Sequence, residues 1–480
     1  MTRWRVAGAC VLVAWCALML AVRRPAHITD DWMGWRQADT QAIARNLAFE
    51  EFAPWKPRID WRGDGPGYVE TEAQIYPTLI AIAMTATGES VWPGQLLSLL
   101  CTAAALALLA LALSKRYGEP AAFAALVVML GHQGTIAIST SIQPDSLALL
   151  AFVIAWLAFV DYVEHGRRWI LWVAVTALAG LVKPTTLELG IAQFVLAALA
   201  GKLRDRKLWL GWAIVVAVVA AYLLYARTLY VRYGNTFGVL SGGDSKLPAL
   251  SMLGQREVWT ELARYSIVWG TGVLAVPAAI YLAAKRALEP VHFALAAGAV
   301  VLVLVALRYT SGVYGTHYHL PHVVLGGWLV AAAAAKLPAR VGIAIAIVAA
   351  LVMGDRALRF LRRLPPEPET LLGDKLAQLA SPDTLVIVRA RAEGYNLEWH
   401  TTNNFEDPRV FYVSRTKGWV VPNDLIGASR IAELAQRGAE FYVHVHQKPI
   451  DAELAAWLAA HGKLAVDSPA GQIYALSRDR

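Results

Sequence analysis

Residues 30–77 read DDWMGWRQADTQAIARNLAFEEFAPWKPRIDWRGDGPGYVETEAQIYP and lie between the first apolar segment of the chain and the next. This stretch is long and polar, and tryptophans and arginines are interleaved with its acids. The acids are Asp30, Asp31, Asp39, Glu50, Glu51, Asp60, Asp64, Glu70 and Glu72. The fold and the function both depend on which side of a membrane the stretch faces.

The chain around this stretch is strongly apolar. Of its 480 residues 57% are hydrophobic and 17% are charged. Blocks such as LALLALAL (106–113) and AAGAVVLVLVAL (296–307) carry no charge, whereas a soluble protein would alternate apolar and polar positions. The composition predicts a polytopic membrane protein.

The net charge of +8 comes from short basic clusters between the apolar runs. That distribution is typical of membrane loops, so no nucleic-acid partner is expected. Cys10, Cys16 and Cys101 all lie in apolar segments without metal-ligand spacing, which favours membrane packing over a metal site or a redox pair.

Eleven membrane spans are predicted. They are residues 6–22, 94–113, 120–138, 146–163, 169–183, 186–201, 208–226, 264–284, 291–307, 318–335 and 341–354. Residues 77–87 are apolar but too few for a bilayer core of about 30 Å, which needs about 20 helical residues. They are predicted to form an interfacial or re-entrant helix.

The basic clusters predict the orientation of the chain. They lie at 115–116, 167–168, 202–207, 285–286 and 336–340, in alternate connections that the positive-inside rule places in the cytoplasm. The first loop (24–77) then faces outside, with the N-terminus inside and, for eleven spans, the C-terminus outside. The arginines at 356–363 are an exception to this scheme.

From about Pro365 the pattern changes to short strands and capped helices. Strands are predicted at 384–388, 410–413, 441–445 and 473–476, and helices at 429–437 and 451–460. The predicted fold class is an α-helical polytopic membrane protein with a small C-terminal α/β soluble domain. The expected division is a membrane domain at 1–355 and an extracytoplasmic domain at 365–480.

Candidate acids of the first loop have structural and functional interpretations. Asp39 opens DTQAIARN, where spacing alone favours a helix N-cap over a general base. Asp30 and Asp31 lie closer to the span end and are alternatives for the base. Glu70 and Glu72, at alternate positions of an extended segment, are expected to share one face, although a solvated loop explains them equally well.

Later outer connections supply further candidates, because ionisable residues near the bilayer tend to line a site. Asp145 is either a helix cap or a site residue. Lys183, at the turn of an apolar hairpin, suits a lipid phosphate, and snorkelling is the ordinary alternative. His317, Tyr318 and His319, in YGTHYHLPH, favour phosphate contact over a metal site.

These motifs resemble the integral-membrane glycosyltransferases of the GT-C fold, and most closely family 39, which includes lipid A aminoarabinose transferases and protein O-mannosyltransferases. GWRQADTQAIARN (34–46) and GYVETEAQIYP (67–77) resemble the first outer loop of that family. PDSLALL (144–150), LVKPT (181–185) and YHLP (318–321) resemble its later landmarks in the same order. The resemblance extends to about residue 355. Two departures are Arg36-Gln37, where many relatives carry Asp-Glu, and the absence of a double proline before Pro77.

The resemblance implies transfer of a sugar from a polyprenyl-phosphate donor to an acceptor hydroxyl on the outer face of a bacterial inner membrane, with inversion. One carboxylate among Asp39, Glu72, Asp31 and Asp30 would serve as general base. Lys183, Arg36, Arg58 and His319 would contact the lipid phosphate. The acceptor is left open between a lipid, a glycan and a protein, and no cofactor is assigned, with a divalent cation left open.

Two other classes of function fit parts of the sequence. A transporter or flippase for an amphiphilic lipid would place binding residues near the bilayer midplane, often in paired halves. Here the polar residues gather at one face instead. A membrane-anchored scaffold for the C-terminal domain would leave the acidic first loop without a task, and is ranked last.

Overall fold

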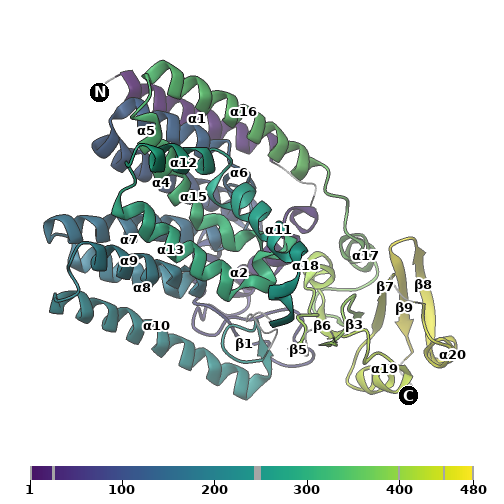
Figure 1. Cartoon of the computed structure of the whole chain (residues 1–480). Coiled ribbons are helices and arrows are strands. Elements are labelled where there is room, and N and C mark those ends of the chain that lie inside the picture. Colours follow the sequence, from purple (N-terminus) through teal and green to yellow (C-terminus); the bar gives the residue numbers. More distant parts are fainter. Residues whose placement is uncertain (1–2, 24–26, 243–249, 398–400, 447–448, 478–480) are drawn as a thin grey trace. The chain divides into compact units, whose positions relative to one another are not determined.

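The computed structural model describes residues 3–23, 27–242, 250–397, 401–446 and 449–477 (Figure 1). Parts of the expected first loop (24–77) and of the connection between the spans predicted at 208–226 and 264–284 therefore lie outside the described residues. The chain forms two compact units. The helical unit comprises Met1–Arg24, Trp92–Tyr222 and Lys246–Arg363, and the mixed unit comprises Pro25–Val91, Leu223–Ser245 and Leu364–Arg480. The expected division at 355 and 365 stays a prediction.

The helical unit is a bundle of apolar helices. Its α-helices are α1 (Arg3–Val22), α4 (Trp92–Tyr117), α5 (Glu119–Leu130), α6 (Gln133–Ile138), α7 (Asp145–His165), α8 (Trp169–Val182), α9 (Glu188–Leu199), α10 (Arg206–Tyr233, whose last residues belong to the mixed unit), α11 (Arg256–Tyr265), α12 (Ala275–Ala284), α13 (Pro290–Val305), α14 (Leu307–Thr310), α15 (Val323–Ala334) and α16 (Ala339–Arg362). The 3₁₀-helices η2 (Pro184–Leu187), η3 (Leu250–Gly254) and η5 (Val313–His322) and the π-helix η4 (Ser266–Thr271) connect several of them. The predicted polytopic helical class is confirmed.

Among the described residues, α1, α4, α7, α10 and α16 are long and apolar enough to cross a membrane singly. The segments 256–271 and 275–284 form a pair bent by 89°, which would make a sixth span. The count of eleven therefore stays a prediction.

One predicted span is broken in the middle. Residues 120–138 form α5 and α6, separated at Gly131 and His132. A Cβ at Gly131 would lie 2.5 Å from the carbonyl oxygen of Ala350, so α16 packs closely against this break. The His132 side chain accepts the amide of Thr135 and caps α6.

The mixed unit contains a five-stranded sheet in the order β6-β3-β7-β9-β8. β3, β6 and β7 are parallel, whereas β9 runs antiparallel to β7 and β8. The strands are β3 (Leu385–Arg389), β6 (Lys417–Val421), β7 (Phe441–Val445), β8 (Gly462–Ser468) and β9 (Gly471–Leu476). The helices of this region are α17 (Pro368–Leu376), α18 (Arg409–Ser414), α19 (Ala428–Gln436) and α20 (Ala452–His461), and a short ladder joins β4 (Tyr395–Asn396) to β5 (Thr401–Thr402).

The strand predicted at 410–413 is wrong, because these residues lie in α18. Its buried residues are Arg409, Val410, Phe411 and Ser414, and Val410 and Ser414 lie four positions apart on one face of the helix. A short run of apolar and β-branched residues does not distinguish a buried strand from a buried helical turn. The sequence analysis also missed α17, β6 and β8.

The first loop folds with the sheet and not as an independent segment. It contributes η1 (Ile28–Asp30), α2 (Gly34–Phe49), β1 (Val69–Glu70) and α3 (Ile75–Thr87), and β1 pairs in parallel with β2 (Asn235–Thr236). One buried cluster joins Leu47, Ile59 and Trp61 of the loop to Val386 and Phe411 of the C-terminal part. The loop and the C-terminal sheet therefore share a core.

Candidate active site

Asp39 lies in the interior of α2, so its predicted role as an N-cap is wrong. The helix begins at Gly34, where a Cβ would lie 2.0 Å from the carbonyl oxygen of Thr29. Met33 precedes it with a left-handed backbone, φ 56°. The buried Asp39 carboxylate accepts a hydrogen bond of 3.0 Å from the indole Nε1 of Trp61.

Burial raises the pKa of Asp39 well above the ordinary value of an aspartate. The hydrogen bond from Trp61 and the charge of Arg36 act in the opposite direction, while the charges of Asp407 and Asp60 add to the increase. A carboxylate whose pKa is displaced upward accepts a proton at a higher pH, which suits a general base.

Arg36 lies one turn before Asp39 on α2 and forms an ion pair with Glu72. Its guanidinium also lies over the ring of Phe237, 5.4 Å from the centroid. Glu72 accepts a second hydrogen bond of 2.8 Å from the hydroxyl of Thr71. Asp39, Arg36 and Glu72 therefore lie in one part of the mixed unit, and all three are candidates of the sequence analysis.

Glu70 binds the segment 236–241 of the same unit through hydrogen bonds. Its carboxylate accepts the hydroxyl of Thr236 at 2.9 Å and the amides of Leu240 and Ser241 at 2.9 and 3.0 Å. These contacts fix the 236–241 turn beside β1. Glu70 and Glu72 therefore hold different segments.

The other candidates of the first loop also have partners of their own. Arg58 pairs with Glu50 at 3.3 Å and with Glu51 at 3.6 Å. Asp31 accepts the side-chain amide of Gln37 at 3.2 Å, and Asp30 accepts the backbone amide of Glu367 at 2.9 Å. Asp30 therefore anchors the beginning of the C-terminal part.

In the helical unit, the candidates Asp145 and Tyr318, from distant segments, both contact Lys183. The Lys183 ammonium forms an ion pair with Asp145 and lies 5.6 Å from the ring centroid of Tyr318. The ring of His317 lies tilted against that of Tyr318, with 4.3 Å between centroids. Asp145 is the first residue of α7, and its carboxylate pairs with the lysine.

His319 points elsewhere. Its Nε2 lies 2.8 Å from the carbonyl oxygen of Thr310, and the side chain is fully buried. The adjacent His322 instead pairs with Glu188 at 3.0 Å. The sequence analysis missed this His322–Glu188 pair, because Glu188 lies inside a predicted apolar span and no local pattern marks its partner.

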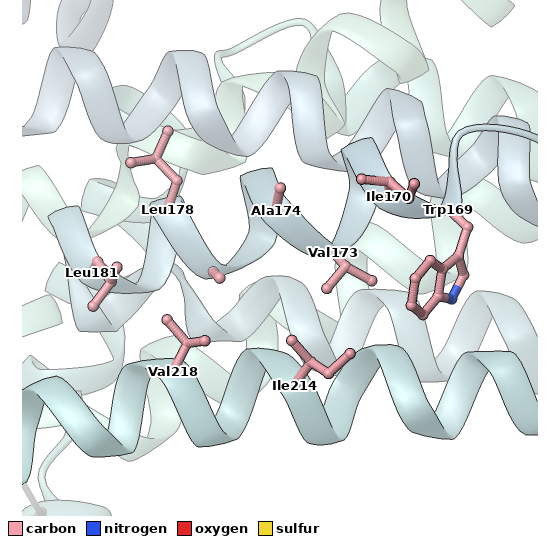
Figure 2. Close-up of a pocket in the computed structure, with 9 residues that line it drawn as sticks. Trp169, Ile170, Val173, Ala174, Leu178, Leu181, Ile214 and Val218 are labelled. Atoms are coloured by element: carbon pink, nitrogen blue, oxygen red, sulfur yellow. The ribbon is translucent and has the colours of Figure 1, made fainter.

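An apolar groove of about 450 Å³ lies between α8 and α10 (Figure 2). Ile170, Val173 and Leu178 from α8, with Ile214 and Val218 from α10, contribute to its lining. At one end the indole Nε1 of Trp169 donates to the carbonyl oxygen of Lys207 at 2.8 Å. At the other end lies Leu181, two residues before Lys183. The side chains that line the groove are apolar, which suits the hydrocarbon chain of a membrane lipid.

Within the described residues, no group of three or more His, Cys, Asp or Glu side chains is arranged to hold a metal ion.

Comparison with known proteins finds a partial family match and similar folds. Residues 72–225 match the family described as dolichyl-phosphate-mannose-protein mannosyltransferase. The fold is similar to that of ArnT from Cupriavidus metallidurans bound to undecaprenyl phosphate, with a TM-score of 0.62, 13% identity and 99% of each chain covered. It is also similar to the arabinofuranosyltransferase AftD from Mycobacteria (TM-score 0.54, 14% identity, 99% of this chain and 42% of that chain) and to the Archaeoglobus fulgidus oligosaccharyltransferase (TM-score 0.55, 12% identity, 98% and 74%). The search of curated proteins found no match.

The chain has the fold of the GT-C integral-membrane glycosyltransferases and is a multi-pass membrane protein. The resemblance to these enzymes found in the loop motifs is confirmed, and within the chain the match to the mannosyltransferase family covers residues 72–225. Fold and family match together support a glycosyltransferase.

Proposed function

We propose that this protein transfers a sugar from a polyprenyl-phosphate donor to an acceptor hydroxyl at the outer face of a bacterial inner membrane. The observation that carries the proposal is the buried Asp39 carboxylate, held by Trp61 beside the Arg36–Glu72 pair. A buried acid with a raised pKa has the properties of a general base, and the fixed cation beside it supplies a favourable electrostatic environment.

The chemistry is a single displacement. The acceptor oxygen attacks the anomeric carbon while Asp39 takes the hydroxyl proton, and the bond between that carbon and the phosphate oxygen breaks. The leaving lipid phosphate gains negative charge, which cationic donors stabilise. One displacement inverts the anomeric centre and needs no nucleophilic carboxylate. Glu72 is the second candidate for the base.

Lys183 and the α8–α10 groove support a lipid-phosphate donor. An ammonium has three N–H donors, so Lys183 can contact a phosphate while it pairs with Asp145. The groove reaches Leu181, which lies two residues from this lysine. A donor with its phosphate at Lys183 and its isoprenoid chain in the groove satisfies both observations. ArnT was solved with undecaprenyl phosphate, a lipid of this chemistry.

The shared core of the mixed unit supports the expected sidedness. The first loop, the segment at 223–245 and the C-terminal sheet fold together, so all three belong on one side of the membrane. The positive-inside rule places the first loop outside. The C-terminal domain is then extracytoplasmic, with the N-terminus in the cytoplasm.

The test is transfer of radiolabelled sugar from polyprenyl-phosphate donors by purified protein, with membrane extracts as the source of acceptors. We expect labelled product from the wild type and none above background from Asp39→Asn. Asp64→Asn, at an exposed carboxylate of the same loop, is the control and should retain activity.

The bent pair of segments at 256–284 is the observation that favours the alternative, a transporter or flippase, because transporters often use broken helices. A lipid-flux assay in proteoliposomes distinguishes the two. Flux of labelled lipid, together with no sugar transfer from any donor, would refute the proposed glycosyltransferase function.

A further inference from the structure

We propose that Lys417 of the C-terminal sheet is a positioning residue for Asp39, acting through Asp60 and Trp61 of the first loop. All four residues belong to the mixed unit. The inference rests on the proposed function and gives the C-terminal domain a role in the transfer reaction.

The loop segment that carries Trp61 is held by an edge strand. β6 is the outermost strand at one end of the sheet. The amide of Gly418 donates to the carbonyl oxygen of Asp60 at 3.2 Å, and the amide of Gly63 donates to the carbonyl oxygen of Gly418 at 2.6 Å. The backbone at 60–63 thus covers an edge that would otherwise present unpaired groups.

Gly418 makes this close approach feasible. Its φ is +146°, and a Cβ there would lie 1.9 Å from the carbonyl oxygen of Val386 on β3. Only glycine lets the strand pass this point while both neighbours stay in hydrogen-bond range.

Charged side chains fix the same segment. The buried Asp60 carboxylate accepts three hydrogen bonds. The donors are the Lys417 ammonium at 2.7 Å, the Arg45 guanidinium at 2.5 Å and the Asn46 side-chain amide at 3.0 Å. Burial alone would raise the pKa of Asp60, but Arg45 and Lys417 hold it below its ordinary value. Lys417 also donates to Glu50 at 2.8 Å. Because Arg45, Asn46 and Glu50 lie in or directly after α2, one lysine ties the loop and α2 to the sheet.

Trp61 transmits this constraint to the candidate base. It directly follows Asp60, and its indole is buried in the core shared with Val386 and Phe411. The ring also makes an edge contact with Phe237, 5.7 Å between centroids. A side chain packed on several sides can hold its N–H in one direction, and that N–H donates to Asp39.

A structural role alone would leave the reaction at Asp39 unchanged once the protein is folded. A positioning role predicts that loosening Asp60 changes the chemical step, because small displacements of a catalytic group cost large factors in rate, up to about 100-fold. Changes in kcat and in its pH profile therefore separate the two.

The experiment compares Lys417→Met with Lys417→Arg and with Lys463→Met, which alters an exposed lysine of the same domain. Sugar transfer is measured across pH with each purified, folded variant. We expect kcat of Lys417→Met to fall about tenfold or more with the donor KM within about twofold. Lys417→Arg should recover much of the loss, and Lys463→Met should match the wild type.

The acid limb of the pH profile should move to higher pH in Lys417→Met. Among the groups acting on Asp39, Arg36 and Trp61 lower its pKa, whereas Asp407 and Asp60 raise it. Removing Lys417 leaves the charge of Asp60 less compensated and loosens Trp61, and both changes raise the pKa of Asp39. If Lys417→Met does not fold, Lys417→Gln replaces it, because a glutamine keeps an N–H donor toward Asp60 without the charge and leaves the Arg45–Asp60 pair intact. Its kcat should fall in the same direction.

A double-mutant cycle with Trp61→Phe tests the route. If Lys417 acts through Trp61, the two losses in kcat are less than additive. Additive losses, or an unchanged kcat and pH profile in Lys417→Met, would overturn the inference. A wild type without transfer activity would instead refute the proposed function.

Discussion

At the scale of single residues, buried charges with fixed partners distinguish this chain. Asp39 is buried with an indole donor, Asp60 with two cations and Lys183 with one carboxylate. A buried charge is costly unless it is paired, so each pair constrains what a substitution does to stability as well as to activity.

Replacing Asp39 by Asn should separate activity from stability. Loss of the base should reduce transfer by about 100-fold or more. Burial raises the pKa of Asp39 in the folded state, so the folded chain holds this proton to higher pH than the unfolded chain. The contribution of Asp39 to the free energy of unfolding therefore falls as pH rises from its unfolded to its folded pKa, and stays low above that window.

An asparagine at position 39 removes the free-energy cost of burying a charged carboxylate, and its side-chain oxygen can still accept the hydrogen bond from Trp61. At neutral pH the variant should thus unfold at the same temperature as the wild type or higher, measured by thermal unfolding in detergent. A clear loss of stability with activity retained would contradict both parts of the prediction.

Lys183→Met should destabilise the helical unit by about 3–5 kcal/mol, because it leaves Asp145 buried without its cation. The double variant Lys183→Met/Asp145→Asn should regain most of that stability without regaining transfer. Thermal unfolding and the donor KM measure the two effects. Recovery of transfer in the double variant would show that the pair is structural only.

At the scale of elements, two features organise the candidate machinery. The groove between α8 and α10 ends beside the turn that carries Lys183, and the edge of β6 holds the loop that carries Trp61. Neither feature depends on a sequence motif, because each comes from packing between elements that are distant in the chain.

Ala174→Trp should fill part of the α8–α10 groove (Figure 2) and raise the KM for a long-chain donor about tenfold, equivalent to about 1.4 kcal/mol. Leu171→Trp, at an exposed position of α8 that is not part of the groove lining, is the matched control. Steady-state kinetics with donors of several chain lengths provide the measurement. Equal KM values for the two variants would show that the donor chain binds elsewhere.

At the scale of the whole molecule, the shared core of the mixed unit limits the number of membrane crossings. A chain whose first loop and C-terminal sheet lie on one side must cross the membrane an even number of times between them. Together with the first predicted span, a common side predicts an odd total, as in the predicted count of eleven.

Cysteine labelling tests this sidedness in the full chain. In a background without Cys10, Cys16 and Cys101, Asp64→Cys and Asp467→Cys should react with an impermeant maleimide in intact spheroplasts. Arg204→Cys, between α9 and α10, should react only after lysis. Labelling of Asp64→Cys without Asp467→Cys would contradict the common side.

The sequence by itself determined the membrane class, the acidic first loop, and three strands and two helices of the C-terminal domain. These features follow from local composition and periodicity, which are properties of neighbouring residues. The loop motifs also identified Asp39, Glu72, Asp145 and Lys183 as candidates.

Only the tertiary structure decided which candidates meet. Asp39 was favoured as an N-cap because an acid precedes helix formers, yet α2 begins at Gly34. Its partner Trp61 lies 22 positions away, and Lys417 lies 357 positions from Asp60. Burial and pairing of a charge depend on such long-range contacts, whereas helix periodicity and capping patterns depend on residues a few positions apart.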